Sequence, residues 1–316
     1  SPGNLLHNFK IFRMRIFIIA VMLLFMQTSI AQDTASYTSN ELVYSRKDGM
    51  ALTMIRLTPT EKPNGRGIIS LVSGNWISNY SVAPGYIKRA NVLIKAGYTV
   101  FMVFHSSQPR YAIPDAVEDV RRAIRFVRYN AASYGIDPNH IGITGSSSGG
   151  HLSLMAALMD DEAVQDIKDP VDRVSSRVQA VAVFYPPVDF LNWGVGNPEL
   201  QKQIMIRTRV IGAFDFKRFN DSTGLYESVK DDEAVKKIAT KYSPITAVSK
   251  DDPPVMIAHG DADFVVPLQQ SQSLIQKLTE AGVPNELIIH PKGGHGWKSM
   301  EIEVQRFVSW FDKYLR

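Results

Sequence analysis

A serine between glycines is the most informative feature of the 316-residue chain. Ser147 stands in the run Gly145-Ser146-Ser147-Ser148-Gly149, so glycine occupies the second position on either side of it. An apolar β-rich run leads into this turn, and an apolar helical pattern follows it. In that context the spacing predicts a nucleophile elbow, a strained strand-to-helix turn that projects the serine hydroxyl above a sheet. The alternative is an ordinary Ser/Gly-rich loop.

A nucleophilic serine needs an imidazole to accept its proton and a carboxylate to orient that imidazole. His295 lies in the run Gly293-Gly294-His295-Gly296 after an expected strand, and glycine neighbours favour a loop over a core position. We therefore expect His295 to be the base. Asp261 and Asp263 both follow another expected strand. Asp263 is preferred as the acid because it lies farther beyond the strand end, and Asp261 is the alternative.

The elements that must position these residues alternate along the chain. Strands alternating with helices predict βαβ units, hence a mostly parallel sheet with helices on both faces. Ligands bind outside the carboxyl ends of such strands. The expected strands are 41–45, 51–58, 67–72, 98–104, 141–144, 178–184, 255–259 and 286–290, the first two forming a hairpin, and the expected helices are 83–96, 115–134, 267–281 and 302–314.

One segment, 192–242, interrupts this alternation. It holds helical patterns at 198–211 and 231–241 around an aromatic, glycine-containing middle. Because it falls between two core strands, we expect an insertion over the active face, acting as a lid. A solvated helical excursion without a gating role is the equal alternative.

The N-terminus has the layout of a secretory signal peptide. Lys10, Arg13 and Arg15 precede the apolar run 16–26, and Ser29-Ile30-Ala31 fits a cleavage site. Eleven apolar residues are fewer than the ~20 that span a bilayer. The sequence thus predicts a leader at 1–31, a single catalytic domain at 32–316, a secreted or periplasmic location and no stable membrane anchor. An uncleaved signal anchor is the minor alternative.

Composition narrows the functional classes. The chain carries a net charge of +4, and the expected leader holds three basic and no acidic residues, so the remainder carries +1. That balance does not favour nucleic-acid binding. The chain has no cysteine, which excludes disulfides and thiolate metal sites.

Longer motifs resemble those of α/β-hydrolase esterases of the hormone-sensitive-lipase-like and acetylxylan/feruloyl-esterase-like type. The resemblance runs from about Gly67 to the C-terminus. It is most specific over 131–152. A second part is Tyr242-Ser243-Pro244-Ile245 followed by Asp252-Pro253-Pro254, His259-Gly260-Asp261-Ala262-Asp263 and Val266-Pro267, and a third is His295-Gly296-Trp297. The order serine, aspartate, histidine is that of α/β-hydrolases and differs from the chymotrypsin and subtilisin orders. The resemblance implies Ser147 as nucleophile, Asp263 as acid and His295 as base, with no metal or organic cofactor.

The chain departs from the family pattern at the loop that helps to form the oxyanion hole. Such enzymes usually carry His-Gly-Gly-x-Trp there, whereas this chain has Val72-Ser73-Gly74-Asn75-Trp76. Backbone donors depend little on side chains, so we expect the N–H groups of Ser148 and of Gly74 or Asn75 to hold the oxyanion. Losing one such donor typically costs ~10²–10³ in turnover.

The sequence therefore predicts a secreted serine esterase, and the resemblance suggests acetyl or feruloyl esters of plant polysaccharides as substrates. Trp76, Tyr185 and Trp193 are expected to line the substrate pocket, with ordinary packing as the alternative for each. A prolyl-oligopeptidase-like exopeptidase is a second hypothesis, but the chain has no room for the usual propeller. A catalytically silent binding protein is a third, which the intact triad disfavours.

Overall fold

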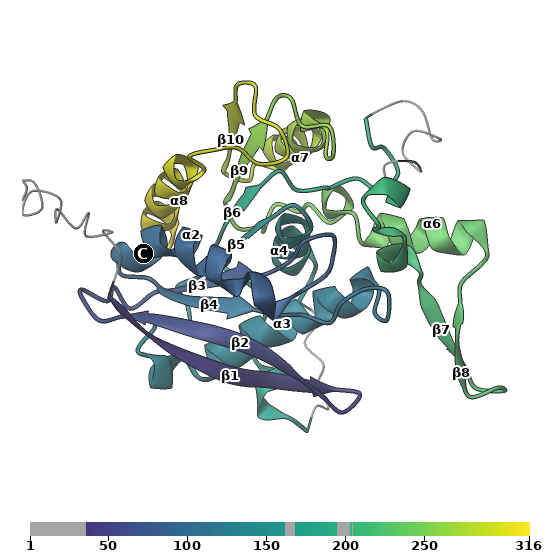
Figure 1. The fold of residues 1–316 in the computed structure, drawn as a ribbon, viewed down its shortest axis with the longest axis horizontal. Helices are drawn as coiled ribbons and strands as arrows, with labels where there is room; N and C mark the ends of the chain where they lie inside the picture. Colours follow the sequence, from purple (N-terminus) through teal and green to yellow (C-terminus); the bar gives the residue numbers. More distant parts are fainter. Residues whose placement is uncertain (1–35, 162–167, 195–202, 204) are drawn as a thin grey trace, which may run out of the picture. The chain divides into compact units, whose positions relative to one another are not determined.

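An eight-stranded sheet runs through the protein, in the strand order β1-β2-β4-β3-β5-β6-β9-β10 (Figure 1). The computed structural model describes residues 36–161, 168–194, 203 and 205–316, so the expected leader 1–31 and the start of the expected helix 198–211 lie outside the described residues. The strands of this sheet are β1 (Tyr37–Lys47), β2 (Met50–Pro59), β3 (Gly67–Leu71), β4 (Thr99–Val103), β5 (Ile141–Ser146), β6 (Ala180–Phe184), β9 (Val255–Gly260) and β10 (Asn285–His290).

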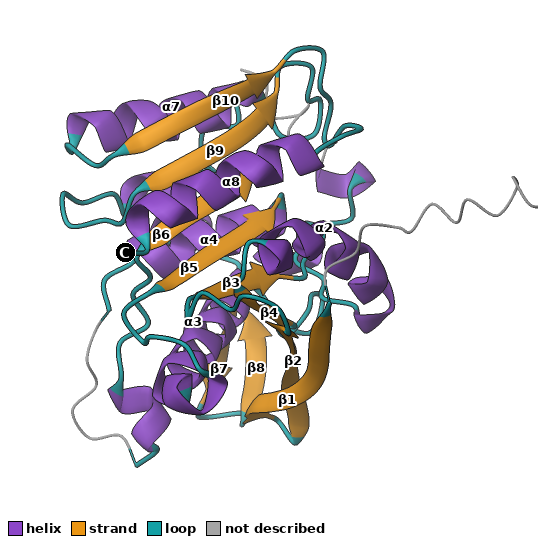
Figure 2. Ribbon diagram, turned by 90° about the vertical axis from the view of Figure 1, so that its left-hand side faces the viewer, coloured by secondary structure: helices purple, strands orange, loops and turns teal. Residues whose placement is uncertain are grey.

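Strand directions agree with the expected mostly parallel sheet. β1 and β2 form the expected antiparallel hairpin, and β2 is also antiparallel to β4. Every neighbouring pair from β4 to β10 is parallel. Figure 2 shows the sheet twisting progressively along the strand order, as the handedness of strands requires. The carboxyl ends of β5, β6, β9 and β10 therefore meet at one edge.

Helices cover both faces of the sheet. They are α2 (Ala83–Lys95), α3 (Ile113–Tyr129), α4 (Ser148–Leu158), α6 (Asp232–Lys241), α7 (Leu268–Glu280) and α8 (Glu301–Tyr314). Residues of α2 and α8 share one apolar core, and residues of α3, α4 and α7 share the other. Strand β3 shows the alternation, since Ile68 faces the first core and Ile69 the second. All residues of β3, β4 and β6 are buried, as parallel strands covered on both faces must be.

Two expected elements differ from the structure. The expected helix 115–134 is divided, because α3 ends at Tyr129 and a 3₁₀ helix at Ala131–Tyr134 follows, closed by Gly135 at φ +66°. In the insertion, the expected helix 231–241 is present as α6, but 217–228 forms a hairpin of β7 (Lys217–Asn220) and β8 (Leu225–Ser228) that the sequence analysis missed. Its strands are only four residues long, too short for a clear alternating pattern.

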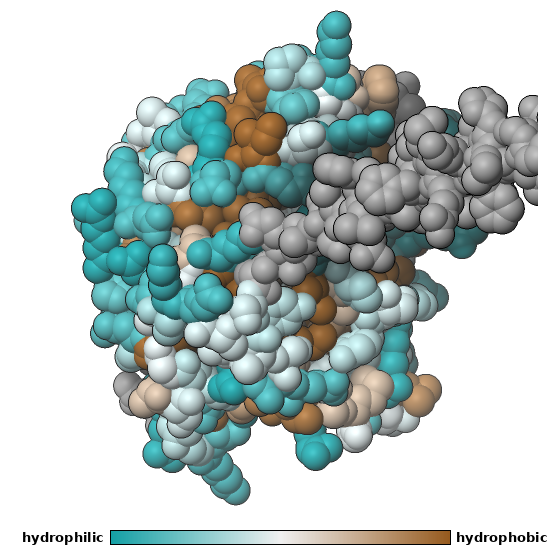
Figure 3. Space-filling view, turned by 60° about the vertical axis from the view of Figure 1, so that its left-hand side comes forward, coloured by the Kyte–Doolittle hydropathy of each residue, from teal (hydrophilic) through white to brown (hydrophobic). Residues whose placement is uncertain are grey.

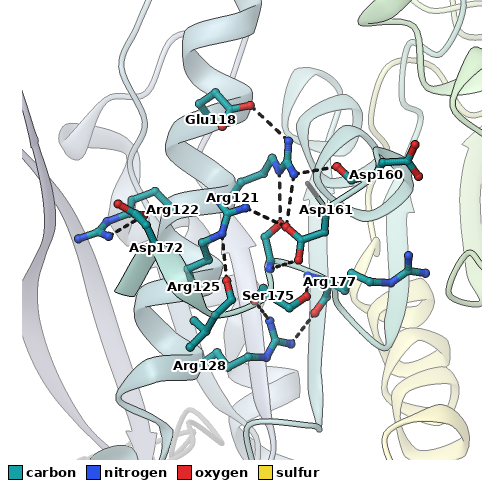
Figure 4. A network of polar contacts seen from close by, with 12 residues as sticks. Glu118, Arg121, Arg122, Arg125, Arg128, Asp160, Asp161, Asp172, Ser175 and Arg177 are labelled. Atoms are coloured by element: carbon teal, nitrogen blue, oxygen red, sulfur yellow. Dashed lines mark hydrogen bonds and ion pairs between the residues drawn. The ribbon is translucent and has the colours of Figure 1, made fainter. Parts of the chain in front are cut away.

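Ion pairs hold α3 to the chain that leads into β6 (Figure 4). Asp161 Oδ1 lies 2.8 Å from Arg125 Nη2 and 3.4 Å from Arg121 Nη2. Arg128 donates to the carbonyl oxygen of Ser175. Burial raises the pKa of Asp161, but hydrogen bonds from serines 175 and 176 and the Arg125 charge lower it to about 2. Asp161 is therefore charged at neutral pH and fixes the position of α3.

The face of the protein in Figure 3 is mainly hydrophilic. On the face in Figure 3, hydrophilic residues cover most of the described area, with hydrophobic residues in small patches between them. Single exposed hydrophobic residues are normal on protein surfaces. Among the described residues, no helix has the length and apolar character needed to cross a membrane.

One of the tight backbone contacts among the described residues lies where β5 passes into α4. A Cβ atom on Gly145 would lie 2.4 Å from the carbonyl oxygen of Gly149. We predict that Gly145→Ala destabilises the protein by ~1–3 kcal/mol, as overpacking does, and lowers Tm by ~2–12 °C. Gly85→Ala is the matched control, because a Cβ at that position in α2 meets no atom within 4 Å. Equal Tm values for the two variants would contradict the prediction; thermal unfolding followed by circular dichroism measures them.

Candidate active site

Ser147 occupies a strained turn at the carboxyl end of β5. Its backbone has φ 54° and ψ −123°, a conformation that costs free energy for any residue with a Cβ. Its N–H donates to the carbonyl oxygen of Phe184 at 3.0 Å, which ties the turn to the end of β6. Helix α4 begins at the next residue. The structure thus forms the strand-turn-helix elbow that the sequence predicts.

Three side chains from three strand ends form one hydrogen-bonded chain. Ser147 Oγ lies 2.8 Å from His295 Nε2. His295 Nδ1 lies 2.8 Å from Asp263 Oδ2. Asp263 follows β9 and His295 follows β10, so the parallel sheet brings together residues up to 148 positions apart. A carboxylate acceptor places the proton on Nδ1, which leaves Nε2 able to accept the serine proton.

The carboxylate of Asp263 is buried and well supplied with donors. Its Oδ1 accepts the N–H groups of Val265 and Val266 at 2.8 and 2.9 Å, and its Oδ2 lies 3.4 Å from His259 Nε2. Burial raises the pKa of Asp263, but the hydrogen bonds from His259 and His295 outweigh burial and hold this pKa well below its usual range. Asp263 is therefore ionised at neutral pH.

Asp261, the alternative acid, lies elsewhere. It is exposed, and its Oδ1 accepts the N–H of Lys292 at 2.5 Å. This contact braces the β10 loop. The geometry therefore favours Asp263 as the partner of His295.

The N–H of Gly74, one of the expected oxyanion donors, already makes a hydrogen bond within its own loop. It donates to the carbonyl oxygen of Ile77 at 3.0 Å in a two-residue antiparallel bridge. Asn75 follows it in a left-handed conformation at φ 54°, and its N–H donates no hydrogen bond within the described residues. Ser148 is the first residue of α4, so its N–H has no partner within that helix. The geometry thus selects Asn75 and Ser148 and leaves Gly74 as a brace of the loop.

Two amide side chains hold the Asn75 loop to the insertion. Asn75 Nδ2 donates to the carbonyl oxygen of Thr208 at 3.0 Å. Gln108 Nε2 donates to the carbonyl oxygens of Asn75 and Arg209 at 2.9 and 2.7 Å. The sequence analysis missed Gln108, because a loop glutamine carries no motif and its partners lie 33 and 101 positions away.

A cavity of about 110 Å³ opens beside the serine. Ser147, Ser148 and Asn75 line its polar end. Its remaining walls are mostly apolar and come from the core and the insertion, among them Trp76, Phe190, Trp193, Met205, Val210, Phe214 and Val266. Two of the three expected aromatic residues therefore line the cavity. Tyr185 does not, because it is buried with its ring 4.6 Å from the His295 ring, where it supports the imidazole.

The amino-acid sequence of the chain matches a known protein family. A model of the BD-FAE family matches residues 55–278, more than two thirds of the chain. The chain belongs to the BD-FAE family of α/β-hydrolase esterases.

Several relatives of this BD-FAE protein are esterases by name. Esterase LipQ from Mycobacterium tuberculosis is 31% identical over 68% of this chain and 46% of its own length. An acetylxylan esterase from Xylanibacter ruminicola is 26% identical over 85% of this chain and 48% of its own length. The chain spans about half the length of the curated relatives it matches.

A solved structure confirms the α/β-hydrolase fold. It is described as a truncated form of a carbohydrate esterase from gut microbiota, and it is 29% identical with a TM-score of 0.66. The match covers 90% of this chain and 99% of that chain.

His151 links the oxyanion loop of this BD-FAE protein to its insertion. Trp76 Nε1 donates to His151 Nδ1 at 3.1 Å, and His151 Nε2 donates to the carbonyl oxygen of Tyr242 at 2.8 Å. Both contacts require the neutral ring with its proton on Nε2. Burial lowers the pKa of His151 to about 4. The histidine is therefore a neutral structural bridge at physiological pH.

This bridge predicts a pH dependence of stability. The unfolded chain protonates His151 below about pH 6.5, whereas the folded chain does so only near pH 4. Between these values the unfolded state binds more protons, so the stabilisation is complete above pH 6.5 and falls, by up to about 3 kcal/mol, as the pH approaches 4. In urea unfolding experiments, the free energy of unfolding should fall less from pH 6.5 to pH 4.5 for His151→Asn than for wild type.

Phe190→Leu is the control for that experiment, because Phe190 contacts the His151 ring but does not titrate. It should lower stability equally at both pH values. An unchanged pH slope in His151→Asn would contradict the assignment.

Proposed function

We propose that this protein hydrolyses carboxylic esters through an acyl-enzyme on Ser147. The observation that carries the proposal is the hydrogen-bonded chain from Asp263 through His295 to Ser147. Ser147 Oγ attacks the ester carbonyl carbon while His295 Nε2 takes its proton. Asp263 holds the imidazole in the required tautomer and stabilises the imidazolium. The N–H groups of Asn75 and Ser148 stabilise the tetrahedral oxyanion.

The remaining steps of the reaction use the same groups. His295 gives its proton to the departing alcohol as the carbon–oxygen bond breaks, which leaves the acyl group on Ser147. A water molecule then gives a proton to His295 and attacks the acyl carbon. Collapse of that intermediate returns the proton to Ser147 and releases the carboxylic acid.

We propose acetyl esters of plant polysaccharide fragments as the substrate class. The names of the acetylxylan esterase and carbohydrate esterase relatives support it. The cavity of about 110 Å³ beside Ser147 favours a short acyl group over the substituted ring of a feruloyl group. The relatives named above support an esterase and not an exopeptidase. The N-terminal pattern supports the further proposal that the protein acts after export.

The mechanism predicts covalent capture of one residue. A fluorophosphonate probe should label the wild-type protein at Ser147 and leave Ser147→Ala unlabelled. Asp263→Asn should keep its fold but lose about 10³–10⁴ in kcat, because the histidine then adopts the wrong tautomer. Labelling of Ser147→Ala at the wild-type rate, or a proline-peptide amide hydrolysed far faster than p-nitrophenyl acetate, would overturn the assignment.

The cavity predicts a change in acyl-chain preference. Met205 lines the cavity from the insertion, whereas its neighbour Ile206 is exposed and does not line it. Met205→Ala should raise kcat/KM for p-nitrophenyl hexanoate relative to acetate by about tenfold, because a few buried methylene groups are worth ~1–3 kcal/mol. Ile206→Ala should leave the ratio unchanged. The same ratio in both variants would show that this cavity does not hold the acyl group.

A further inference from the structure

A second chain of polar groups is buried behind the oxyanion hole. Ser148 Oγ lies 3.0 Å from Ser73 Oγ, and Ser73 Oγ lies 2.9 Å from His105 Nε2. The other ring nitrogen, Nδ1, lies 2.7 Å from the carbonyl oxygen of Ser106. Ser73, Ser148 and His105 are at most 4% exposed. Buried polar groups at such distances are hydrogen-bonded to one another.

The chemistry of these groups fixes the direction of every hydrogen bond. A carbonyl oxygen only accepts, so His105 Nδ1 must carry a proton and donate to Ser106. Burial lowers the pKa of His105, so the ring is neutral and Nε2 is an acceptor. Ser73 must then donate its hydroxyl proton to His105 Nε2. The oxygen of Ser73 is left to accept the hydroxyl proton of Ser148.

We call the hydrogen-bonded series Ser148–Ser73–His105–Ser106 the relay. An ion pair fixes its far end, at Ser106. Asp119 Oδ2 accepts the N–H of Ser106 at 2.8 Å and also accepts its hydroxyl. Asp119 Oδ1 lies 2.5 Å from Lys47 Nζ. Asp119 belongs to α3, and Lys47 ends β1. The segment after β4 that carries His105 and Ser106 is therefore fixed to two further elements.

The near end of the relay joins the two halves of the oxyanion hole. Ser148 provides one N–H donor on α4, and Ser73 lies two positions before Asn75, which provides the other. The carbonyl oxygen of Ser73 also accepts the hydroxyl of Tyr86 at 3.1 Å. The connection to Ser148 is made by the Ser73 side chain, so a glycine at position 73 could not make it.

We propose that His105 is a positioning residue that sets the distance between the two oxyanion donors through Ser73 and Ser148. His105 does not touch the substrate. By accepting from Ser73, it orients the hydroxyl that accepts from Ser148, and this fixes the elbow and the oxyanion loop relative to each other. The inference rests on the proposed esterase function, because these two N–H donors act on the oxyanion of that reaction.

The proton position on His105 tests the relay without any activity measurement. Long-range ¹H–¹⁵N spectra of the wild-type protein distinguish the two neutral tautomers. We expect His105 to be protonated on Nδ1, whereas His151 should be protonated on Nε2. His105→Asn identifies the His105 signal. A proton on His105 Nε2 would reverse the hydrogen bond to Ser73 and overturn the proposal.

A pair of substitutions tests the effect on catalysis. His105→Gln places an amide oxygen where Nε2 stands and preserves an acceptor for Ser73, whereas His105→Asn removes that acceptor. We expect His105→Asn to lower kcat for p-nitrophenyl acetate by about 10- to 100-fold, a part of the cost of losing an oxyanion donor, with KM within about threefold. His105→Gln should retain most of the wild-type kcat.

Two further variants separate positioning from stability. Ser73→Ala interrupts the same relay, so combining it with His105→Asn should lower kcat no further than either change alone. Tyr98→Phe deletes a partly buried hydrogen bond to Asp312, just before the other end of β4, and should leave kcat unchanged. Wild-type kcat in folded His105→Asn, or additive losses in the double variant, would overturn the proposal. A wild type no more active than Ser147→Ala would instead refute the esterase function.

Discussion

The site depends on one steric constraint, the close approach of the end of β5 to the start of α4. No Cβ fits at Gly145 because the backbone of Gly149 lies against it. The chain therefore reverses within one residue, and Ser147 takes up the positive φ that this reversal demands. Such strain persists only where the surroundings determine the backbone. Here β5 is held between β3 and β6, and the N–H of Ser147 is bound to the end of β6.

Asp263, His105 and His151 are buried polar groups around this turn, and they differ in charge. Asp263 is the ionised group, stabilised by donors from its own loop and from His259 and His295. His105 and His151 are buried and have lowered pKa values. Each connects the oxyanion loop to a different part of the fold. Neutral imidazoles suit this task because each offers one donor and one acceptor in fixed directions.

The sequence predicted the parts of the site that depend on local pattern. The glycines around Ser147 and around His295 signalled turns, and the order of Ser147, Asp263 and His295 agreed with parallel-strand topology. It could not choose between Gly74 and Asn75, because the choice depends on a bridge to Ile77 that forms only when the loop folds. Tyr185 was misplaced for a similar reason. Its positive φ of 34° turns the ring under His295, and no spacing rule reveals such a turn.

Contacts between residues distant in sequence account for the parts of the site that the sequence did not predict. Ser73 meets His105 across 32 positions and Ser148 across 75, and Gln108 meets Arg209 across 101. Each of these residues would be unremarkable in a loop or a helix. Their roles arise only when β3, β4 and β5 lie side by side in the order 4-3-5. The sequence thus specifies the reacting groups locally, whereas the fold specifies what holds them.

The most direct test of this account is a crystal structure of the protein with Ser147 phosphonylated by an organophosphate. The phosphoryl oxygen of this adduct stands in for the oxyanion of the tetrahedral intermediate. The account predicts that this oxygen accepts hydrogen bonds from the N–H groups of Asn75 and Ser148, while Gly74 still donates to Ile77. A phosphoryl oxygen bound by Gly74 or directed into solvent would contradict it.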